Sequence, residues 1–344
     1  MTEQLKLKLN DSKATRWGAL VIVAFTMMAA YYVNDVVAPL KTMLETDLAW
    51  SSTDFGFFTG GYSFLNVFFL MLIWGGLILD RFGIRFTGKL ATILMVGGTA
   101  LEYYAMTGLA GADATLFGIN EIFGYKTGVF VAFAGYSIFG VGAEVAGITV
   151  SKIIAKWFKG KELATAMGVQ VALARIGSQA GYAVAIPLAR AFGISTPVLL
   201  GLVLLLGGMI AFFIFAVMDK KLDKQMEAAA IAAGTEDEEE KFSFKDVKNI
   251  LVNPGFWLIA LLCVLFYSCV FPFQKFASEL MIIKYGINEN VAGTFAGLPA
   301  LGALILTPVF GGFIDKRGKS ASIMLLGSAM LICVHFIYAI PDIN

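Results

Sequence analysis

The sequence contains Gly76-Leu-Ile-Leu-Asp80-Arg81-Phe-Gly83-Ile-Arg85, and the same pattern returns as Gly312-Phe-Ile-Asp315-Lys316-Arg317-Gly318-Lys319. In each copy an apolar run ends in an acid, which is followed by bases and a turn glycine. Each copy joins two long apolar runs, and the copies lie at matching places in two parts of the chain. This arrangement indicates an internal parallel repeat of the kind found in secondary transporters.

The composition is that of a membrane protein. Hydrophobic residues make up 58% of the chain and charged residues only 15%, with a mean hydropathy of +0.78. Soluble domains are nearer to about 45–50% apolar and about 25% charged. Much of the apolar surface must therefore face lipid or neighbouring helices. The net charge of +1 argues against a nucleic-acid partner.

Apolar runs long enough to cross a bilayer as helices occur nine times in the sequence. They cover residues 17–40, 54–79, 86–108, 126–150, 163–190, 194–218, 255–283, 289–314 and 320–340. Lipid offers no partner to an open backbone, and the runs are too long for barrel strands, so we expect helices. The sequence predicts an all-α, polytopic membrane protein.

The charged loops predict the orientation and the domain division. Alternate loops hold 20 Lys and Arg residues on one side against 4 on the other, which predicts a cytoplasmic N-terminus. The longest polar stretch follows the sixth span and contains an acidic run. We therefore expect a six-helix bundle over residues 1–218, a cytoplasmic linker over 219–253 and a partial bundle of three helices over 254–344.

Two opposite charges lie near the middle of the predicted spans. Arg175 is about twelve residues into the fifth span, roughly 18 Å along a helix, and Glu144 lies at a comparable depth in the fourth. An ionisable group at this depth is costly, so it indicates a functional site. The two residues could form a structural ion pair, or bind a solute that carries both an amine and a carboxylate. The planar guanidinium of Arg175 suits a carboxylate.

Other ionisable residues in the spans allow a functional and a structural interpretation. Asp35, beside Asn34 in the first span, is either a polar group of the transport cavity or a helix-end acid. Lys275 and Glu279 are four residues apart, so a local ion pair is the simpler interpretation. Glu102 lies near the outer end of the third span, where we expect an interfacial position. His335 is the single histidine and is expected to be a hydrogen-bonded packing residue.

The repeated loops predict a conformational latch. Glycine would let each loop lie tightly between helices, and the two acids could pair with bases or helix ends of the opposing bundle. The predicted latch residues are Gly76, Asp80, Arg81, Gly83, Arg85, Asp315, Arg317 and Gly318.

The first loop resembles the signature loop of the major facilitator superfamily, and the loop at Asp315 resembles its second-half copy. The resemblance covers the whole chain. It implies twelve helices in two six-helix bundles and alternating access by rocking of the bundles. The sequence ends after nine predicted spans, so we expect either a fragment or the loss of three spans, with an incomplete second bundle.

A narrower resemblance is to a branch of that superfamily, the lysosomal-type dipeptide transporters and their microbial relatives. It rests on Phe139-Gly-Val-Gly-Ala-Glu144, Ala174-Arg175-Ile-Gly-Ser178 and Phe266-Tyr-Ser-Cys-Val-Phe-Pro-Phe273. The resemblance implies that Glu144 holds the peptide amino group and Arg175 its carboxylate. Many superfamily members carry an arginine where this chain has Tyr136, and that departure favours facilitated diffusion over proton symport.

We therefore expect a secondary transporter for small solutes, with dipeptides or small peptides moved by facilitated diffusion. The alternatives are an organic-anion or other small-metabolite transporter that uses Arg175 alone, or an inactive fragment. The sequence has no Ser/His/Asp set, metal-ligand spacing or phosphate-binding glycine loop, so no enzyme, cofactor or metal is expected. The expected location is a bacterial-type plasma membrane, or the lysosomal membrane if the source is an animal.

Overall fold

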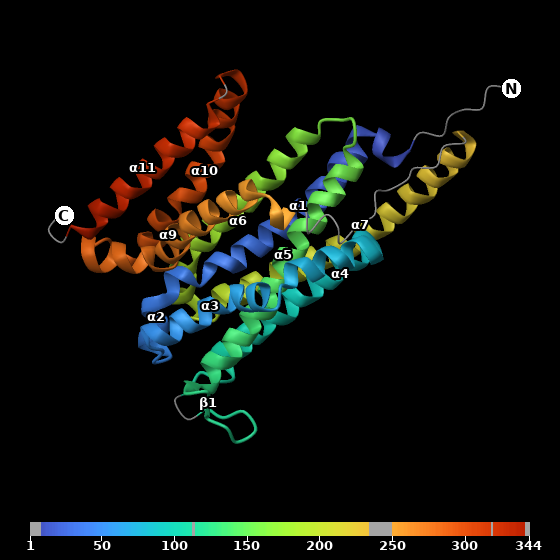
Figure 1. Ribbon diagram of the computed structural model, residues 1–344. Coiled ribbons are helices and arrows are strands. Elements are labelled where there is room, and N and C mark those ends of the chain that lie inside the picture. Colours follow the sequence, from blue (N-terminus) through green and yellow to red (C-terminus); the bar gives the residue numbers. More distant parts are fainter. Residues whose placement is uncertain (1–7, 112–113, 234–249, 318, 341–344) are drawn as a thin grey trace.

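The computed structural model describes residues 8–111, 114–233, 250–317 and 319–340, and within them the fold is almost entirely helical (Figure 1). The α-helices are α1 (Lys13–Val36), α2 (Lys41–Asp47), α3 (Ser52–Phe68), α4 (Met71–Thr107), α5 (Thr127–Trp157), α6 (Leu163–Phe192), α7 (Thr196–Ala233), α9 (Pro254–Tyr285), α10 (Glu289–Arg317) and α11 (Ser320–Ala339). Short 3-10 helices are η1 (Leu9–Asp11) and η2 (Ala38–Leu40). The all-α prediction is confirmed apart from a small hairpin of β1 (Glu121–Ile122) and β2 (Tyr125–Lys126).

The predicted spans coincide with helices or with helical pieces. By length and hydropathy, six helices of the described chain could cross a membrane, namely α1 with its continuation to Asp47, α5, α7, α9, α10 and α11. The pair α3 and α4, bent by 58° at its break, makes a seventh. Two predicted spans fall on this pair, because Gly83 leaves the helical conformation (φ 75°, ψ 172°) inside α4. The remaining predicted span is α6, which is long enough but less apolar.

Local sequence signals explain where several helices begin. Ser51 and Asp54 form a capping box at the start of α3: the Ser51 hydroxyl accepts from the Asp54 N–H, and the Asp54 carboxylate accepts from the Ser51 N–H. Asn253 caps α9 through the N–H of Gly255, and Pro254 occupies the first helical position, where its missing N–H costs nothing.

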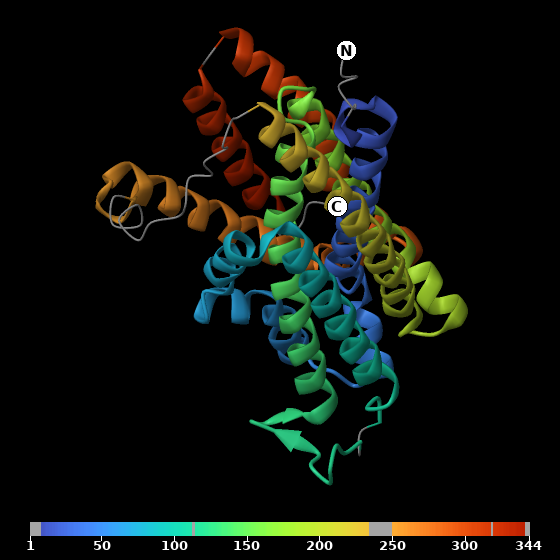
Figure 2. The same ribbon diagram turned by 90° about the vertical axis from the view of Figure 1, so that its right-hand side faces the viewer.

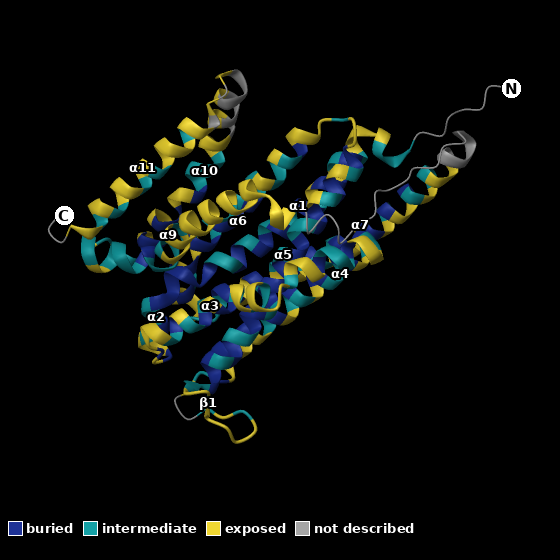
Figure 3. Ribbon diagram, viewed as in Figure 1, coloured by how far each residue is buried: buried dark blue, intermediate teal, exposed yellow. Residues whose placement is uncertain are grey.

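Residues from α1 to α7 form the first half of the fold, and α9 to α11 form the second. The buried side chains lie mainly in the first half, whereas α9 and α11 have many exposed large apolar side chains (Figure 3). Close packing of α4 on α5 requires glycine: a Cβ atom on Gly98 would lie 2.5 Å from the carbonyl oxygen of Gly135. The first half therefore has a well-packed core on which the rest of the site is built.

Described contacts between the halves concentrate at the end of the molecule that carries α2, which we call the α2 end (Figures 1 and 2). Here α10 packs on α6, and α9 packs on η2 and α2. The opposite end carries the loop around Asp80 and is called the motif end. The structure therefore represents a state in which the α2 end is closed by contacts between the halves.

Helix α7, which corresponds to the sixth predicted span, is longer than predicted. The sequence places the end of the sixth span at residue 218, but α7 continues to Ala233, and Asp219 is fully buried. Its carboxylate accepts from Lys156 (2.7 Å) and from the indole of Trp157 (3.0 Å). These partners keep the first polar residue of the predicted linker in the helix. Residues 234–249 of that linker lie outside the described residues.

Candidate functional site

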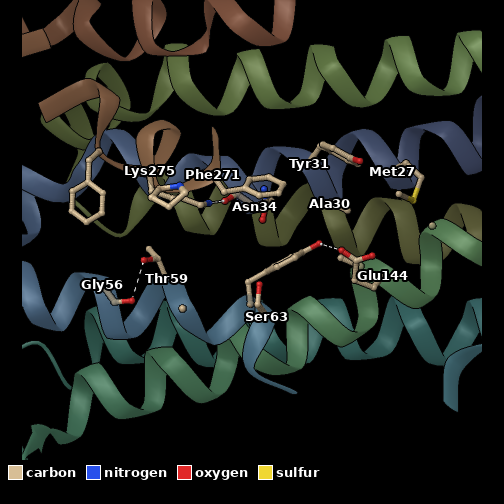
Figure 4. A pocket seen from close by; sticks show the side chains of 16 residues that line it. Met27, Ala30, Tyr31, Asn34, Gly56, Thr59, Ser63, Glu144, Phe271 and Lys275 are labelled. Atoms are coloured by element: carbon tan, nitrogen blue, oxygen red, sulfur yellow. Dashed lines mark hydrogen bonds between the residues drawn. The ribbon is translucent and has the colours of Figure 1, made fainter. Parts of the chain in front are cut away.

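A cavity of about 540 Å³ lies between α1, α3, α5 and α9 (Figure 4). Most of its lining is apolar or small, and its polar groups come from four different helices, as expected for a solute site between helices of a bundle. The polar lining residues are Tyr31, Asn34, Thr59, Tyr62, Ser63, Glu144 and Lys275.

Glu144 faces this cavity from α5. Its carboxylate accepts a hydrogen bond of 2.8 Å from the hydroxyl of Tyr62 on α3. Among the described residues, no lysine or arginine forms an ion pair with Glu144. A half-buried carboxylate with only a neutral donor remains available to a cationic group of a solute.

Arg175 lies on α6 beside the cavity rather than in its lining. Its guanidinium carbon is 5.7 Å from the ring centroid of Tyr31, which does line the cavity. A cation over an aromatic face is held by the ring quadrupole. The structure therefore does not pair Arg175 with Glu144: Glu144 lines the cavity, whereas Arg175 contacts the ring of a lining residue, Tyr31. The solute-binding role of both stays a prediction.

Asn34 and Asp35 occupy different positions although they are adjacent in sequence. Asn34 lines the cavity, and its backbone carbonyl accepts from the hydroxyl of Tyr136 (2.7 Å) and from the ammonium of Lys275 (2.6 Å). Asp35 is not in the lining; its Oδ1 accepts from the Asn34 amide (2.8 Å) and lies 3.8 Å from the Lys275 nitrogen. Asp35 therefore does not face the cavity itself but contacts two residues that do, Asn34 and Lys275.

The predicted local pair of Lys275 and Glu279 is wrong. Glu279 binds Lys41 at 2.5 Å, and Lys275 binds the α1 groups instead. Both side chains project from the face of α9 that packs on the first half. There, residues of the first half lie closer to each side chain than Lys275 and Glu279 lie to one another. Lys41 is only 2% exposed and also binds Glu45 at 2.7 Å. In the sequence this lysine is only one of the four basic residues counted on the side opposite the N-terminus.

Glu102 and His335, two other ionisable residues of the predicted spans, differ in whether their polar atoms have hydrogen-bond partners. Glu102, expected at the interface, is fully buried in α4, and neither carboxylate oxygen has a hydrogen-bond partner in the described chain. Burial without hydrogen bonds costs free energy for a neutral carboxyl group and far more for a charged one. The expectation for His335 is confirmed, since its Nδ1 lies 2.9 Å from the carbonyl oxygen of Leu331 and its ring lies beside Phe273.

The first latch loop makes its ion pairs within the first half. Asp80 binds Lys152 at 2.9 Å, and Arg85 reaches Asp219 at 3.4 Å. The predicted partners were in the opposing bundle, but in this state the described contacts between the halves lie at the other end. Gly83 has the left-handed φ that the turn requires.

The other latch residues have little packing. A Cβ on Gly76 would meet nothing within 4 Å, so tight packing of this glycine is not seen. The Arg81 guanidinium lies over the ring of Phe82, and that of Arg317 over the ring of Phe313. Gly318 and the side chain of Asp315 lie outside the described residues. The latch role stays a prediction.

Comparison with known proteins gives a consistent picture. Residues 18–343 match the sequence profile of the Major Facilitator Superfamily. The lysosomal dipeptide transporter MFSD1 of Homo sapiens is 27% identical over 340 residues, covering 95% of this chain and 67% of that protein. The Pongo abelii protein of the same name is 27% identical, covering 93% of this chain and 65% of its own length. The chain thus spans about two thirds of the relatives it matches.

A crystal structure of a D-xylose-proton symporter has the same fold. It superimposes with a TM-score of 0.56 over 87% of this chain and 69% of the symporter, at 16% sequence identity. At this identity the likeness concerns the fold alone.

Proposed function

Because the chain belongs to the Major Facilitator Superfamily, a family of membrane transporters, we propose that it moves small peptides, dipeptides in particular, by facilitated diffusion with alternating access. The names of its relatives suggest the substrate class. We place it in the plasma membrane of a bacterial-type cell with a cytoplasmic N-terminus, or in the lysosomal membrane if it comes from an animal.

The observation that carries this proposal is an acid that faces a cavity between the two halves and has no ion-pair partner in the part of the chain that the structure describes. Glu144 has a neutral donor, Tyr62, and free space beside it. An acid in this position costs free energy unless a cation meets it during the transport cycle. A peptide amino group supplies that cation.

The carboxylate of the same peptide needs a cation at a distance from Glu144. Arg175 is available for this role because its present contact, the ring of Tyr31, is weaker than a bidentate pair with a carboxylate. A shift of Tyr31 or of α6 would bring the guanidinium to the cavity. Asn34 would add a neutral polar contact to the peptide backbone.

A thermal-shift screen tests the proposal. Dipeptides, free amino acids and organic acids would be added to the wild type, to Glu144→Gln and to Arg175→Ala, with Glu121→Gln on the exposed hairpin as the control. We expect dipeptides to raise the Tm of the wild type and the control but not of the two site variants. Organic acids that stabilise Glu144→Gln as well as the wild type would indicate an organic-anion transporter instead. Dipeptide stabilisation that survives in Arg175→Ala would remove this arginine from the site.

A further inference from the structure

Among the described residues of the second half, Lys275 is the one polar residue in the cavity lining. The other lining residues of α9 are Phe271, Pro272 and Phe276, whereas the remaining polar groups all belong to the first half. Lys275 and Asn34 lie together on one side of the cavity, and Glu144 lies farther along it (Figure 4). Within the described residues, a solute that contacts polar groups of both halves in this cavity therefore meets Lys275.

The present partners of Lys275 are poor ones for a buried ammonium. Its nitrogen donates to the neutral carbonyl of Asn34 at 2.6 Å and to the hydroxyl of Tyr136 at 3.1 Å, while the carboxylate of Asp35 is 3.8 Å away. Lys41, by contrast, has carboxylates at 2.7 and 2.5 Å. A buried charge is stabilised by a close, hydrogen-bonded counter-charge, so a carboxylate that enters the cavity is a better partner for Lys275 than these groups.

The helix that carries Lys275 has a weak point beside it. Pro272 lies inside α9, where it has no N–H to donate to the carbonyl of Ser268. The backbone is therefore able to bend one turn before the lysine. A bend at this point would let Lys275 shift within the cavity without unwinding the rest of α9.

We propose that Lys275 binds the carboxylate of the solute and in doing so releases α1. The contacts it gives up are the hydrogen bonds to Asn34 and Tyr136 and the longer ion contact with Asp35, and they join the second half to the first near the α2 end. Occupancy of the cavity thereby removes one contact that keeps this end closed. The inference rests on the proposed function, since it assigns a second carboxylate ligand, from the second half, to the same peptide site.

The spacing of the site favours peptides of about two residues. Glu144 and Tyr136 are eight residues apart on α5, roughly 12 Å at the backbone, and the hydroxyls of Tyr62 and Tyr136 mark the positions of the two charges. The ring centroids of Tyr62 and Tyr136 lie 5.7 Å apart, which is less than this backbone separation. An extended dipeptide spans roughly 7 Å, whereas a single amino acid spans roughly half of that.

The test compares glycylglycine with glycylglycinamide, which keeps the amine but lacks the carboxylate. Apparent Kd values would be measured for the wild type, Lys275→Gln and Lys275→Arg. The control is Lys284→Gln, because Lys284 lies on the same helix and binds backbone carbonyls of Tyr338 and Ile340 away from the cavity. We expect the preference for the free carboxylate to fall about 10- to 100-fold in Lys275→Gln and to persist in the Arg and control variants.

A second readout follows the release of α1. Ser278 is 1% exposed on α9, beside the contact of Ala277 with Ala38, so Ser278→Cys reports opening of the α2 end by its rate of thiol labelling. Glycylglycine should accelerate labelling in the wild type and in Lys275→Arg but not in Lys275→Gln.

The failures of the two proposals are distinguishable. Binding of glycylglycine by the wild type, with an unchanged carboxylate preference in Lys275→Gln, would overturn this inference alone. A wild type that binds no dipeptide would overturn the proposed function and the inference together. Because the preference is a ratio within each variant, partial loss of folded protein does not alter it.

Discussion

Gly293 on α10 lies where the backbones of the two halves approach closely at the α2 end. A Cβ atom at this position would lie 2.2 Å from the carbonyl oxygen of Tyr182 on α6 and 3.2 Å from Cβ of Pro39 on η2. Since ordinary contact begins at 3.4 Å, the Tyr182 backbone would have to recede by about 1 Å. Gly293→Ala therefore acts as a wedge between α10 and the first half.

The wedge should change the population of states rather than destroy the fold. Overpacking costs about 1–3 kcal/mol, and here the cost falls on the closed α2 end, because an open end no longer presses α10 on α6. A free-energy change of this size corresponds to a shift of about 5- to 150-fold toward the open state. Gly302→Ala is the matched control: it lies on the same helix, and a Cβ there meets nothing within 4 Å.

The assay is thiol labelling of Ser278→Cys. The native cysteines Cys263, Cys269 and Cys333 are all exposed, so they would first be replaced by serine. We expect Gly293→Ala to label faster than Gly302→Ala by the factor given above. Equal labelling rates in the two variants, with both proteins folded, would show that the α10–α6 contact does not hold the halves together, and would refute the reasoning.

Three other outcomes follow from buried or paired charges. Lys41→Met leaves the carboxylate of Glu279 without its partner, and breaking a buried pair costs about 3–5 kcal/mol. Because Glu279 is 20% exposed, we expect a loss of Tm that corresponds to about 2–4 kcal/mol. An unchanged Tm would contradict this. Glu102→Gln should leave Tm unchanged or raise it, because an amide resembles a neutral carboxyl; a loss as large as that of Glu102→Ala would show that the charge is needed. The hydrogen bond from Lys161 lowers the pKa of Asp11 below its ordinary 3.8, so this pair stabilises the fold above pH 3.8 and the gain is lost as the pH falls through the folded pKa. Asp11→Asn should then remove part of the Tm difference between neutral pH and about pH 3, and an identical pH profile would contradict this.

The membrane fold could be predicted from the sequence because the bilayer leaves few choices. A run of about 20 apolar residues has to be a helix, and a charged loop that occurs twice marks two related halves. The break between α3 and α4 could not be predicted in this way. It occurs at Leu70, which adopts a left-handed φ of 51° although leucine gives no sequence signal for it.

The location of the candidate site could be predicted from the sequence, but the hydrogen-bond and ion-pair partners of its residues could not. Glu144 was identified by its depth, and it does face the cavity. The partner of Lys275 was not predictable, because helical periodicity relates it only to residues of its own helix. Asn34 and Tyr136 reach it from α1 and α5, at separations in sequence of more than one hundred residues. No rule of local spacing contains that information.

Two ion contacts join α1 and α2 to α9: in one the first half supplies the cation, and in the other it supplies the anion. The two contacts differ in length, and this difference has a consequence for transport. Lys41 of the first half binds Glu279 of the second, and one turn away Lys275 of the second half lies near Asp35 of the first. The Lys41 pair is close and lies outside the cavity lining, so a solute cannot compete for it. The Lys275 contact is long and faces the cavity, so a solute can. On the proposed mechanism, solute binding removes the weaker contact directly. The Lys41 pair and the α10–α6 contact, which includes the Arg190–Glu289 ion pair, then remain as barriers to opening, so weakening of the Lys41 pair should accelerate opening even without solute.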